Sequence, residues 1–176
     1  LLLLPVIFLS ATVNPDILSA RMLYPGQDIL TYKDTPLGKL AVTEREGQVN
    51  LYQGGQPMAI VNDVPEREEK VHYAMSLHPD PKKVLMLAGG LDGSLDEINK
   101  YGIDRLHYIE PDPWLARTAM DRGWISWPEG MHMICGDPGR FLDTASQAYD
   151  VVILNAPPPL TVGSNRFYTD GFFEKV

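Results

Sequence analysis

A glycine-rich turn in the C-terminal half of the chain is the clearest candidate for ligand binding. Residues 84–94 read VLMLAGGLDGS. Ala88, Gly90 and Gly93 match the relaxed pattern G/A-x-G-x-x-G, in which small residues permit a tight turn and a close approach of the ligand to the main chain. Glu110 follows about twenty residues later, where an acid can accept hydrogen bonds from ribose hydroxyls. Together these features predict a nucleoside-binding site.

Two further acids indicate which nucleotide would bind. Asp92 lies inside the turn, where a dinucleotide would place its pyrophosphate, and two negative charges there would repel each other. A ligand with a sulfonium and an amine would be attracted instead, and S-adenosylmethionine and its decarboxylated form are such ligands. Asp137, just past the third apolar run, is placed to accept from an adenine amino group. We therefore expect an adenosyl-sulfonium ligand, with NAD as a distant alternative.

The fourth apolar run ends in a loop that lacks an acid, because residues 155–160 read NAPPPL. The carboxyl ends of buried strands are where α/β enzymes usually place catalytic groups. A positioned carboxylate that takes a proton from a reacting group contributes roughly 10²–10⁴-fold to the rate. Neither Asn155 nor Pro158 can accept that proton. The loop therefore leaves open whether a working active site or only the shell of one lies at this strand end.

The elements that must position these residues alternate between strand and helix. Strands are predicted for residues 82–88, 105–110, 131–135 and 149–155, and helices for residues 94–102, 111–123 and 139–146. Short loops between alternating strands and helices indicate parallel βαβ units, so the fold class is α/β with a doubly wound sheet.

The segment before this sheet has a different pattern, with short strand-like runs and tight turns. Short runs at 38–44, 48–53 and 57–61 are separated by Glu46-Gly47 and Gly54-Gly55, which predicts antiparallel strands joined by tight turns. Residues 66–77 have helical periodicity, and residues 11–28 read as a linker. The predicted organisation is a membrane remnant and linker at 1–28, a small β-domain with a connecting helix at 29–78, and an incomplete nucleoside-binding domain at 79–176.

Composition limits the classes of partner and cofactor. The net charge is −8 and the chain has no Lys/Arg-rich run, which argues against nucleic acid as a partner. The single cysteine, Cys135, allows no internal disulfide, and its apolar neighbours predict that it packs in the core. The 4 histidines show no metal-ligand spacing, so no metal site is expected.

The two ends of the sequence predict a membrane remnant at the start and a further strand after the last residue. Residues 1–9 read LLLLPVIFL, an apolar run too short to span a bilayer and without the basic region of a signal peptide. We interpret it as the remnant of a membrane segment, with the folded part in the cytoplasm; without that remnant the protein would be cytoplasmic. Because a parallel sheet that ends at Asn155 leaves an unpaired edge, we also expect a further strand beyond Val176.

Four segments resemble the polyamine aminopropyltransferases, the spermidine synthase family. They read VLMLAGGLDGSLDEI, HYIEPDP, ICGDPGRFL and YDVVILNAPPPLTVGSNRFYTDGFF. The resemblance runs from about Thr31 to the C-terminus and is closest to a membrane-associated branch with a multi-helix region before the folded part. It implies a small antiparallel β-domain followed by a Rossmann-like S-adenosylmethionine-dependent methyltransferase fold, C-terminally truncated here. It also implies decarboxylated S-adenosylmethionine as co-substrate, a cationic amine as acceptor, and a homodimer.

Five residues match the family's binding positions. Gly89, Gly90 and Asp92 correspond to its glycine-aspartate turn, where the aspartate contacts the amine of the aminopropyl donor. Glu110 corresponds to the acid that holds the ribose. Asp137 corresponds to the acid near the adenine.

The departures concern catalysis. Leu91 replaces a third glycine, and His72-Tyr73-Ala74 replaces a Tyr-His-Glu segment. Asn155 and Pro158 stand where the family has Asp-x-x-Asp-Pro, and Pro158 takes the place of the catalytic aspartate. The resemblance therefore implies a spermidine synthase-like protein whose aminopropyl transfer is altered or absent, and a transferase if it is active.

Two alternatives stay open. The first is an S-adenosylmethionine-dependent methyltransferase, since an Asn followed by prolines is similar to the Asn-Pro-Pro-aromatic loop of amino-group methyltransferases. The second is a nucleoside-binding domain without turnover. Further along the loop, either Arg166 and Tyr168 contact a ligand, or Asn165 and Arg166 fix the loop through backbone hydrogen bonds.

Overall fold

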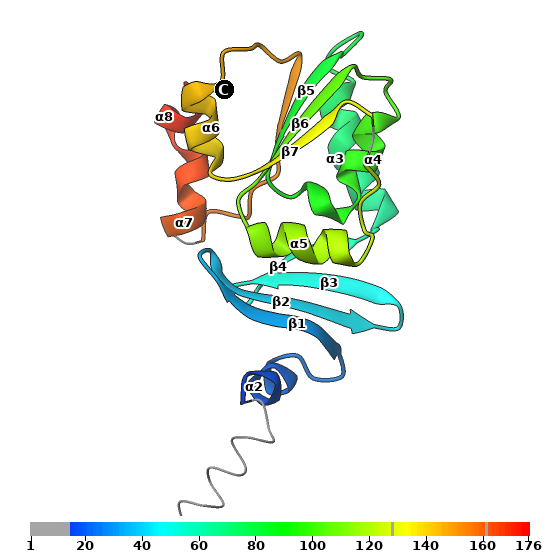
Figure 1. Cartoon of the computed structure of the whole chain (residues 1–176), viewed down its shortest axis with the longest axis vertical. Coiled ribbons are helices and arrows are strands. Elements are labelled where there is room, and N and C mark those ends of the chain that lie inside the picture. The colour runs from blue at the N-terminus through cyan, green and yellow to red at the C-terminus, as the bar shows by residue number, and fades with distance from the viewer. Residues whose placement is uncertain (1–14, 128, 161) are drawn as a thin grey trace, which may run out of the picture. The chain divides into compact units, whose positions relative to one another are not determined.

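The computed structural model describes residues 15–127, 129–160 and 162–176 (Figure 1). The chain separates into two compact units, residues 1–58 and residues 59–176. The apolar run at residues 1–9, and with it the predicted membrane remnant, lies outside the described residues. Among the helices in the described ranges, none is both long enough and apolar enough to cross a membrane.

A four-stranded sheet in the order β1-β2-β3-β4 forms most of the described part of the first unit, and its last strand continues beyond residue 58. Its strands are β1 (Asp28–Thr35), β2 (Gly38–Arg45), β3 (Gln48–Gln53) and β4 (Gln56–Val61). The β1/β2 and β2/β3 pairs are antiparallel. Glu46-Gly47 and Gly54-Gly55 all have positive φ, which suits the two-residue turns that match the twist of a hairpin. The three predicted strand segments are thus strands, as expected.

A helix, α2 (Pro15–Leu23), occupies a stretch that the sequence predicted to be linker. The prediction for residues 11–28 is wrong over this range. Proline at the first helical position fits a helix start because its missing N–H is not needed there. Ala20 is the only buried residue of α2, so the helix has no apolar stripe from which periodicity could reveal it.

The second unit contains a parallel four-stranded sheet in the order β7-β6-β5-β8. Its strands are β5 (Lys83–Leu87), β6 (Arg105–Glu110), β7 (Met131–Cys135) and β8 (Val151–Leu154). All four lie within the segments predicted from the sequence. The strand order reverses between β5 and β8, which is where open α/β sheets form a ligand crevice at their carboxyl ends.

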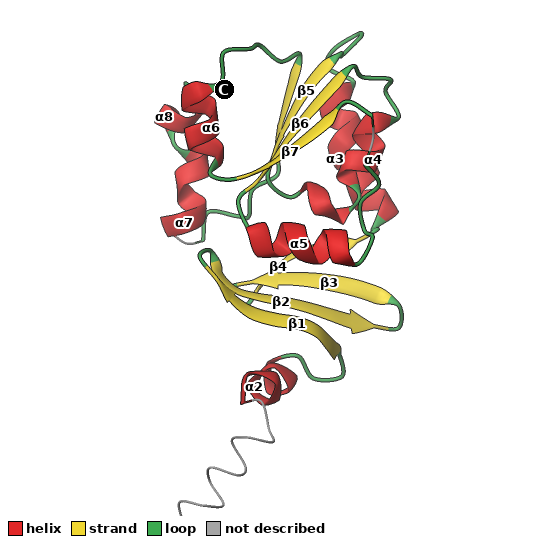
Figure 2. Ribbon diagram, viewed as in Figure 1, coloured by secondary structure: helices red, strands yellow, loops and turns green. Residues whose placement is uncertain are grey.

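Helices cover both faces of this sheet (Figure 2). They are α3 (Val64–Met75), α4 (Ser94–Asn99), α5 (Pro113–Asp121), α6 (Pro138–Thr144), α7 (Val162–Asn165) and α8 (Asp170–Phe173), with 3₁₀ turns η1 (Gly90–Asp92) and η2 (Arg166–Tyr168). Figure 2 shows α3 and α4 on one side of the sheet and α6, α7 and α8 on the other.

Burial explains why the central strand reads as an unbroken apolar run. Leu85 and Leu87 pack with Ile109, Phe167 and Phe172 on the face covered by α6 and α8. The alternate residues of β5, Val84 and Met86, are also fully buried, because a parallel sheet with helices on both faces has no solvent side.

The outer strand β7 differs from the centre of the sheet. Cys135 is exposed, and the side chain of its neighbour Ile134 is 40% exposed. The prediction that Cys135 packs in the core is therefore wrong. β7 lies at one end of the strand order, so only one neighbouring strand covers its backbone.

Candidate functional site

The glycine turn follows β5 in a left-handed backbone conformation. Ala88, Gly89 and Gly93 have φ of 62°, 63° and 108°. A Cβ on Gly89 would lie 2.4 Å from both the side-chain amide nitrogen and the carbonyl oxygen of Asn155. Glycine is required there because β8 ends directly against the turn. The amide of Asn155 donates a 2.8 Å hydrogen bond to the carbonyl of Gly89. The two strand ends at the point of reversal are thereby tied together.

Glu110 ends β6 beside this turn and is 2% exposed. The hydroxyl of Tyr108 donates to Glu110 Oε2 and accepts a 3.1 Å hydrogen bond from the amide of Gly90. The amide of Asp112 donates to Glu110 Oε1 at 2.8 Å. Burial raises the pKa of the Glu110 carboxyl to about 7, and burial followed by the charge of Glu110 raises the pKa of Tyr108 well above its usual value. Tyr108 thus couples the turn to the acid.

Asp92 is also inside the protein, with 4% of its surface exposed. Its Oδ1 accepts from the amide of Ser94 at 2.9 Å. Its Oδ2 forms a 2.8 Å ion pair with Lys70 Nζ, which comes from α3. The predicted amine-binding acid is therefore already paired with a basic side chain of the same unit.

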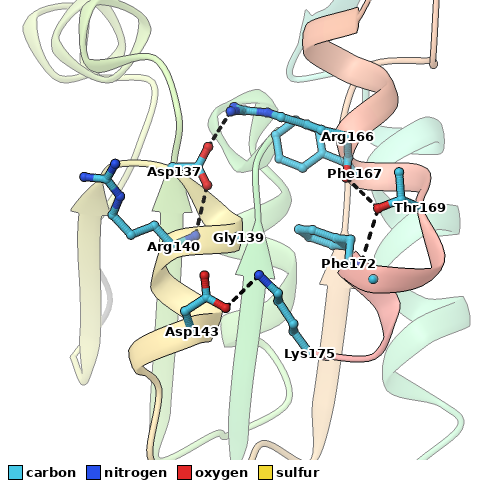
Figure 3. Close-up of a pocket in the computed structure, with 10 residues that line it drawn as sticks. Asp137, Gly139, Arg140, Asp143, Arg166, Phe167, Thr169, Phe172 and Lys175 are labelled. Atoms are coloured by element: carbon cyan, nitrogen blue, oxygen red, sulfur yellow. Dashed lines mark hydrogen bonds and ion pairs between the residues drawn. The ribbon is translucent and has the colours of Figure 1, made fainter.

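Asp137 begins α6 and is more accessible than the other two acids. Its Oδ1 accepts from the amide of Arg140 at 2.9 Å, and its Oδ2 pairs with Arg166 Nη1 at 2.5 Å. Both contacts are visible in Figure 3. Asp137 lines a cavity of about 690 Å³ between α6 and the segment 166–175. Asp92, Glu110 and the glycine turn are not among the residues that line this cavity.

The loop after β8 is held by hydrogen bonds rather than by charge. Tyr168 donates a 2.9 Å hydrogen bond from its hydroxyl to the carbonyl of Ala156. The amide of Leu160 donates to the carbonyl of Pro158 at 2.7 Å, and Pro158 itself is exposed. Arg166 therefore contacts Asp137, and Tyr168 contacts the loop, so both side chains have partners within the protein.

A cluster that the sequence did not indicate lies between α3 and α4. Ligand atoms of Glu68, His72 and Glu97 approach within 4.8 Å of one another. Glu97 is fully buried, but its two oxygens pair with Arg67 Nε at 3.0 Å and with Lys100 Nζ at 2.6 Å. Because these cations already neutralise the central carboxylate, the cluster serves to join α3 to α4.

Sequence reasoning missed two residues of the site. Tyr108 precedes Glu110 by two positions, and residues two apart point to the same face of a strand, so the signal was available. Lys70 contacts Asp92 across 22 positions between a helix and a turn. The spacing of residues along the sequence does not predict a contact between a helix and a distant turn.

Comparison with known proteins gives a consistent result for the second unit. The model of the spermine/spermidine synthase domain matches residues 64–176. A polyamine aminopropyltransferase of Leptospira interrogans is 26% identical over 167 residues, which is 90% of this chain and 33% of that protein. One from Thermococcus kodakarensis is 26% identical over 147 residues, covering 74% of this chain and 50% of that protein.

Solved structures agree on the fold. Spermidine synthase in complex with the transition-state analogue AdoDATO superposes with a TM-score of 0.73 at 20% identity, over 84% of this chain and 53% of that one. Spermidine synthase from Thermotoga maritima superposes with a TM-score of 0.64 at 21% identity, over 73% and 48%. The chain thus spans a third to about half of the length of these proteins.

Proposed function

The chain belongs to the spermine/spermidine synthase family, and from this premise we propose that it binds decarboxylated S-adenosylmethionine or a related adenosyl-sulfonium ligand at the carboxyl ends of β5, β6 and β7. We further propose that the loop after β8 does not support aminopropyl transfer. The observation that carries the first part is the link from Gly90 through the Tyr108 hydroxyl to Glu110. It fixes the turn and the acid relative to each other before any ligand arrives.

Glu110 keeps the capacity to hold a ribose. A carboxylate has about four acceptor positions, two on each oxygen. In the structure each oxygen of Glu110 accepts one hydrogen bond, which leaves about one position on each. Two remaining acceptor positions are what the two adjacent hydroxyls of a ribose require.

The other predicted residues complete the proposed site. Gly89 and Gly90 carry no side chain that would keep a ligand from the main chain of the turn. Asp137 would accept from the adenine amino group, and its pairing with Arg166 holds the carboxylate in place. Asp92 would face the tail of the ligand.

The loop after β8 lacks a proton acceptor for an amine nucleophile. The side-chain amide of Asn155 donates a hydrogen bond to the carbonyl of Gly89. Pro158 has no polar group in its side chain. An amine with a pKa similar to that of lysine, about 10.4, is almost fully protonated at neutral pH. Without a carboxylate the acceptor amine therefore keeps its proton and cannot attack the carbon next to the sulfonium.

Calorimetry of ligand binding tests the first part. Methylthioadenosine, which has the nucleoside but no charged tail, should bind to the wild-type protein. Above pH 7, where the Glu110 carboxyl is ionised, Glu110→Gln should weaken this binding about tenfold, because hydrogen bonds to a charged group contribute about 1.5–3 kcal/mol. The matched control is Glu174→Gln, since Glu174 is exposed near the C-terminus. Failure of all adenosyl compounds to bind would refute the proposal.

An assay of aminopropyl transfer to putrescine tests the second part. Transfer from the decarboxylated donor should stay at or near background for the full-length protein. Robust turnover would contradict the proposal and would mean that another group, such as Asp170, supplies the base.

A methyltransferase that uses S-adenosylmethionine is the second candidate function. The pairing of Asp92 with Lys70 favours it, because the tail of S-adenosylmethionine has a carboxylate that Lys70 could meet. Membrane association and a homodimer also belong to the proposal, and they rest on the family resemblance alone. Fractionation and sedimentation of the full-length protein would test both.

A further inference from the structure

An ion pair occupies the carboxylate that the tail of the ligand would meet. Lys70 Nζ lies 2.8 Å from Asp92 Oδ2, and the two side chains are 20% and 5% exposed. The second oxygen of Asp92 accepts from the amide of Ser94. The pair is thus largely removed from water, where charges interact more strongly than they do at an open surface.

Lys70 is held in this position by the helix that carries it. One turn earlier on α3, Arg67 pairs with the fully buried Glu97 of α4 at 3.0 Å. Arg67 also lies over the glycine turn, since a Cβ on Gly93 would come within 2.6 Å of its Nη1. These contacts fix α3 against the turn and keep the Lys70 ammonium at Asp92.

A ligand tail that is only an amine fits this arrangement poorly. Asp92 and Lys70 together carry no net charge, whereas a lone carboxylate would attract an ammonium. A second ammonium at the same carboxylate would lie about 4–6 Å from Lys70, a distance at which like charges disfavour each other. Displacing Lys70 instead would leave its ammonium without its buried partner.

A tail with both charges fits it well. The α-amino acid end of S-adenosylmethionine has an ammonium and a carboxylate on the same carbon. Asp92 has about one acceptor position left on each oxygen, and Lys70 has three donors, one of which faces Asp92. Each charged group of such a tail would meet the opposite charge, as in a charge-assisted hydrogen bond.

We infer that Lys70 selects a ligand whose sulfonium bears an α-amino acid tail, with Asp92 receiving the ammonium and Lys70 the carboxylate. S-adenosylmethionine then binds in preference to its decarboxylated form. This inference rests on the proposed function, because it concerns the tail of the same adenosyl ligand. It makes Lys70 a specificity-determining residue.

Equilibrium binding of three ligands to the full-length protein tests the inference. The ligands are S-adenosylmethionine, its decarboxylated form and methylthioadenosine. The wild type should bind S-adenosylmethionine at least about tenfold more tightly than the decarboxylated form, given one added charge-assisted contact and one avoided repulsion. Lys70→Met should remove this preference and leave methylthioadenosine binding within about twofold, since that ligand has no charged tail.

Lys100→Met is the matched control. Lys100 also pairs with a buried acid, Glu97, at 2.6 Å, so its loss tests whether any broken ion pair near the turn has the same effect. The preference should persist in this variant and in Lys70→Arg, which keeps the charge.

Two outcomes would overturn the inference while leaving the proposed function intact. One is wild-type protein that binds the decarboxylated form as tightly as S-adenosylmethionine or more tightly, a result that needs no variant to fold. The other is an unchanged preference in Lys70→Met. Absence of binding by all three ligands, methylthioadenosine included, would instead refute the proposed function and the inference with it.

Discussion

The glycine turn at residues 88–93 and the proline loop at residues 155–160 lie at neighbouring strand ends, yet they are built in opposite ways. In the turn, Leu91 and Asp92 are buried, and the Gly90 amide is bonded to a buried hydroxyl. In the loop, Pro158 and Leu160 are exposed. The sequence of the turn is therefore constrained by packing, whereas much of the loop is free to vary.

This difference teaches that binding and catalysis are separable in such a fold. A change in the turn disturbs β5, β8 and Glu110 together, because each contacts it. A change at Pro158 disturbs little, because few atoms surround it. Under the proposed function, this chain keeps the fold and a nucleoside site while Pro158 occupies the catalytic position.

The largest effect is expected from Gly89→Ala. A left-handed φ costs a residue with a Cβ roughly 1–2 kcal/mol, and the new Cβ would lie 2.4 Å from two atoms of Asn155. Relief of such overpacking typically costs about 1–3 kcal/mol more. The free energy of unfolding should fall by about 4 kcal/mol in total, as measured by urea denaturation.

Gly123→Ala separates the two causes. Gly123 has φ of 65°, nearly that of Gly89, but a Cβ there would meet nothing within 4 Å. This variant should lose only the roughly 1–2 kcal/mol that the backbone conformation costs. Equal losses in the two variants would mean that the close approach of β8 to the turn contributes nothing.

The next effect is a pH dependence that belongs to Glu110. Burial raises its pKa from 4.5 to about 7, so in this range the folded state binds a proton that the unfolded state has released. The resulting stability is complete below pH 4.5 and is lost as the pH rises to about 7. The loss is on the order of 3 kcal/mol and can be followed by urea denaturation across this pH range.

Two variants assign this dependence to Glu110. Glu110→Gln cannot ionise and should flatten the profile between pH 4.5 and 7. Tyr108→Phe removes a hydrogen bond that lowers the pKa of Glu110, so the fall in stability should begin at the same pH as in the wild type but continue to a higher pH. A wild-type profile that coincides with that of Glu110→Gln over this interval would show that the pKa of Glu110 is not raised in the folded state.

The sequence predicted those parts of the fold that local patterns encode. The run that became β5 is apolar at every buried position, and α5 begins at Asp112 and Pro113 with a side-chain cap, as such residues favour. Parallel order then follows from topology, and with it the position of Asp92, Glu110 and Asp137 at or just after the carboxyl ends of β5, β6 and β7.

The parts that were missed depend on contacts or their absence. α2 buries only Ala20, so periodicity could not reveal it. Cys135 has apolar neighbours in the sequence but lies on the outer strand β7. The order of strands in a sheet cannot be predicted from the residues of one strand. The pairing of Lys70 with Asp92 depends on the angle at which α3 meets the turn, which is a tertiary property.

A smaller effect is expected from Tyr168→Phe in the loop. Its hydroxyl donates one hydrogen bond to the carbonyl of Ala156, and the side chain is 41% exposed. An exposed hydrogen bond of this kind contributes about 0.5–1 kcal/mol, so the free energy of unfolding should fall by that amount. Amide hydrogen exchange should increase at Ala156 and Leu160, the loop residues next to the three prolines, and stay unchanged in the turn. Faster exchange in both would mean that loop and turn open as one unit.

The smallest effect on stability is expected from Pro158→Asp, which would place an acid at the position that the proposed function assigns to the family's catalytic aspartate. Pro158 is exposed, and surface substitutions usually change stability by within about 0.5 kcal/mol. Aminopropyl transfer to putrescine should nevertheless stay within a few-fold of background, because Pro157 and Pro159 hold φ near about −65° on either side and limit where the carboxylate can point. Adding Asn155→Asp should not help, since it removes the amide that donates to Gly89 and so weakens the junction of loop and turn. A large recovery of activity from Pro158→Asp alone would contradict this comparison. It would mean that the loop already has the catalytic shape and lacks only one carboxylate.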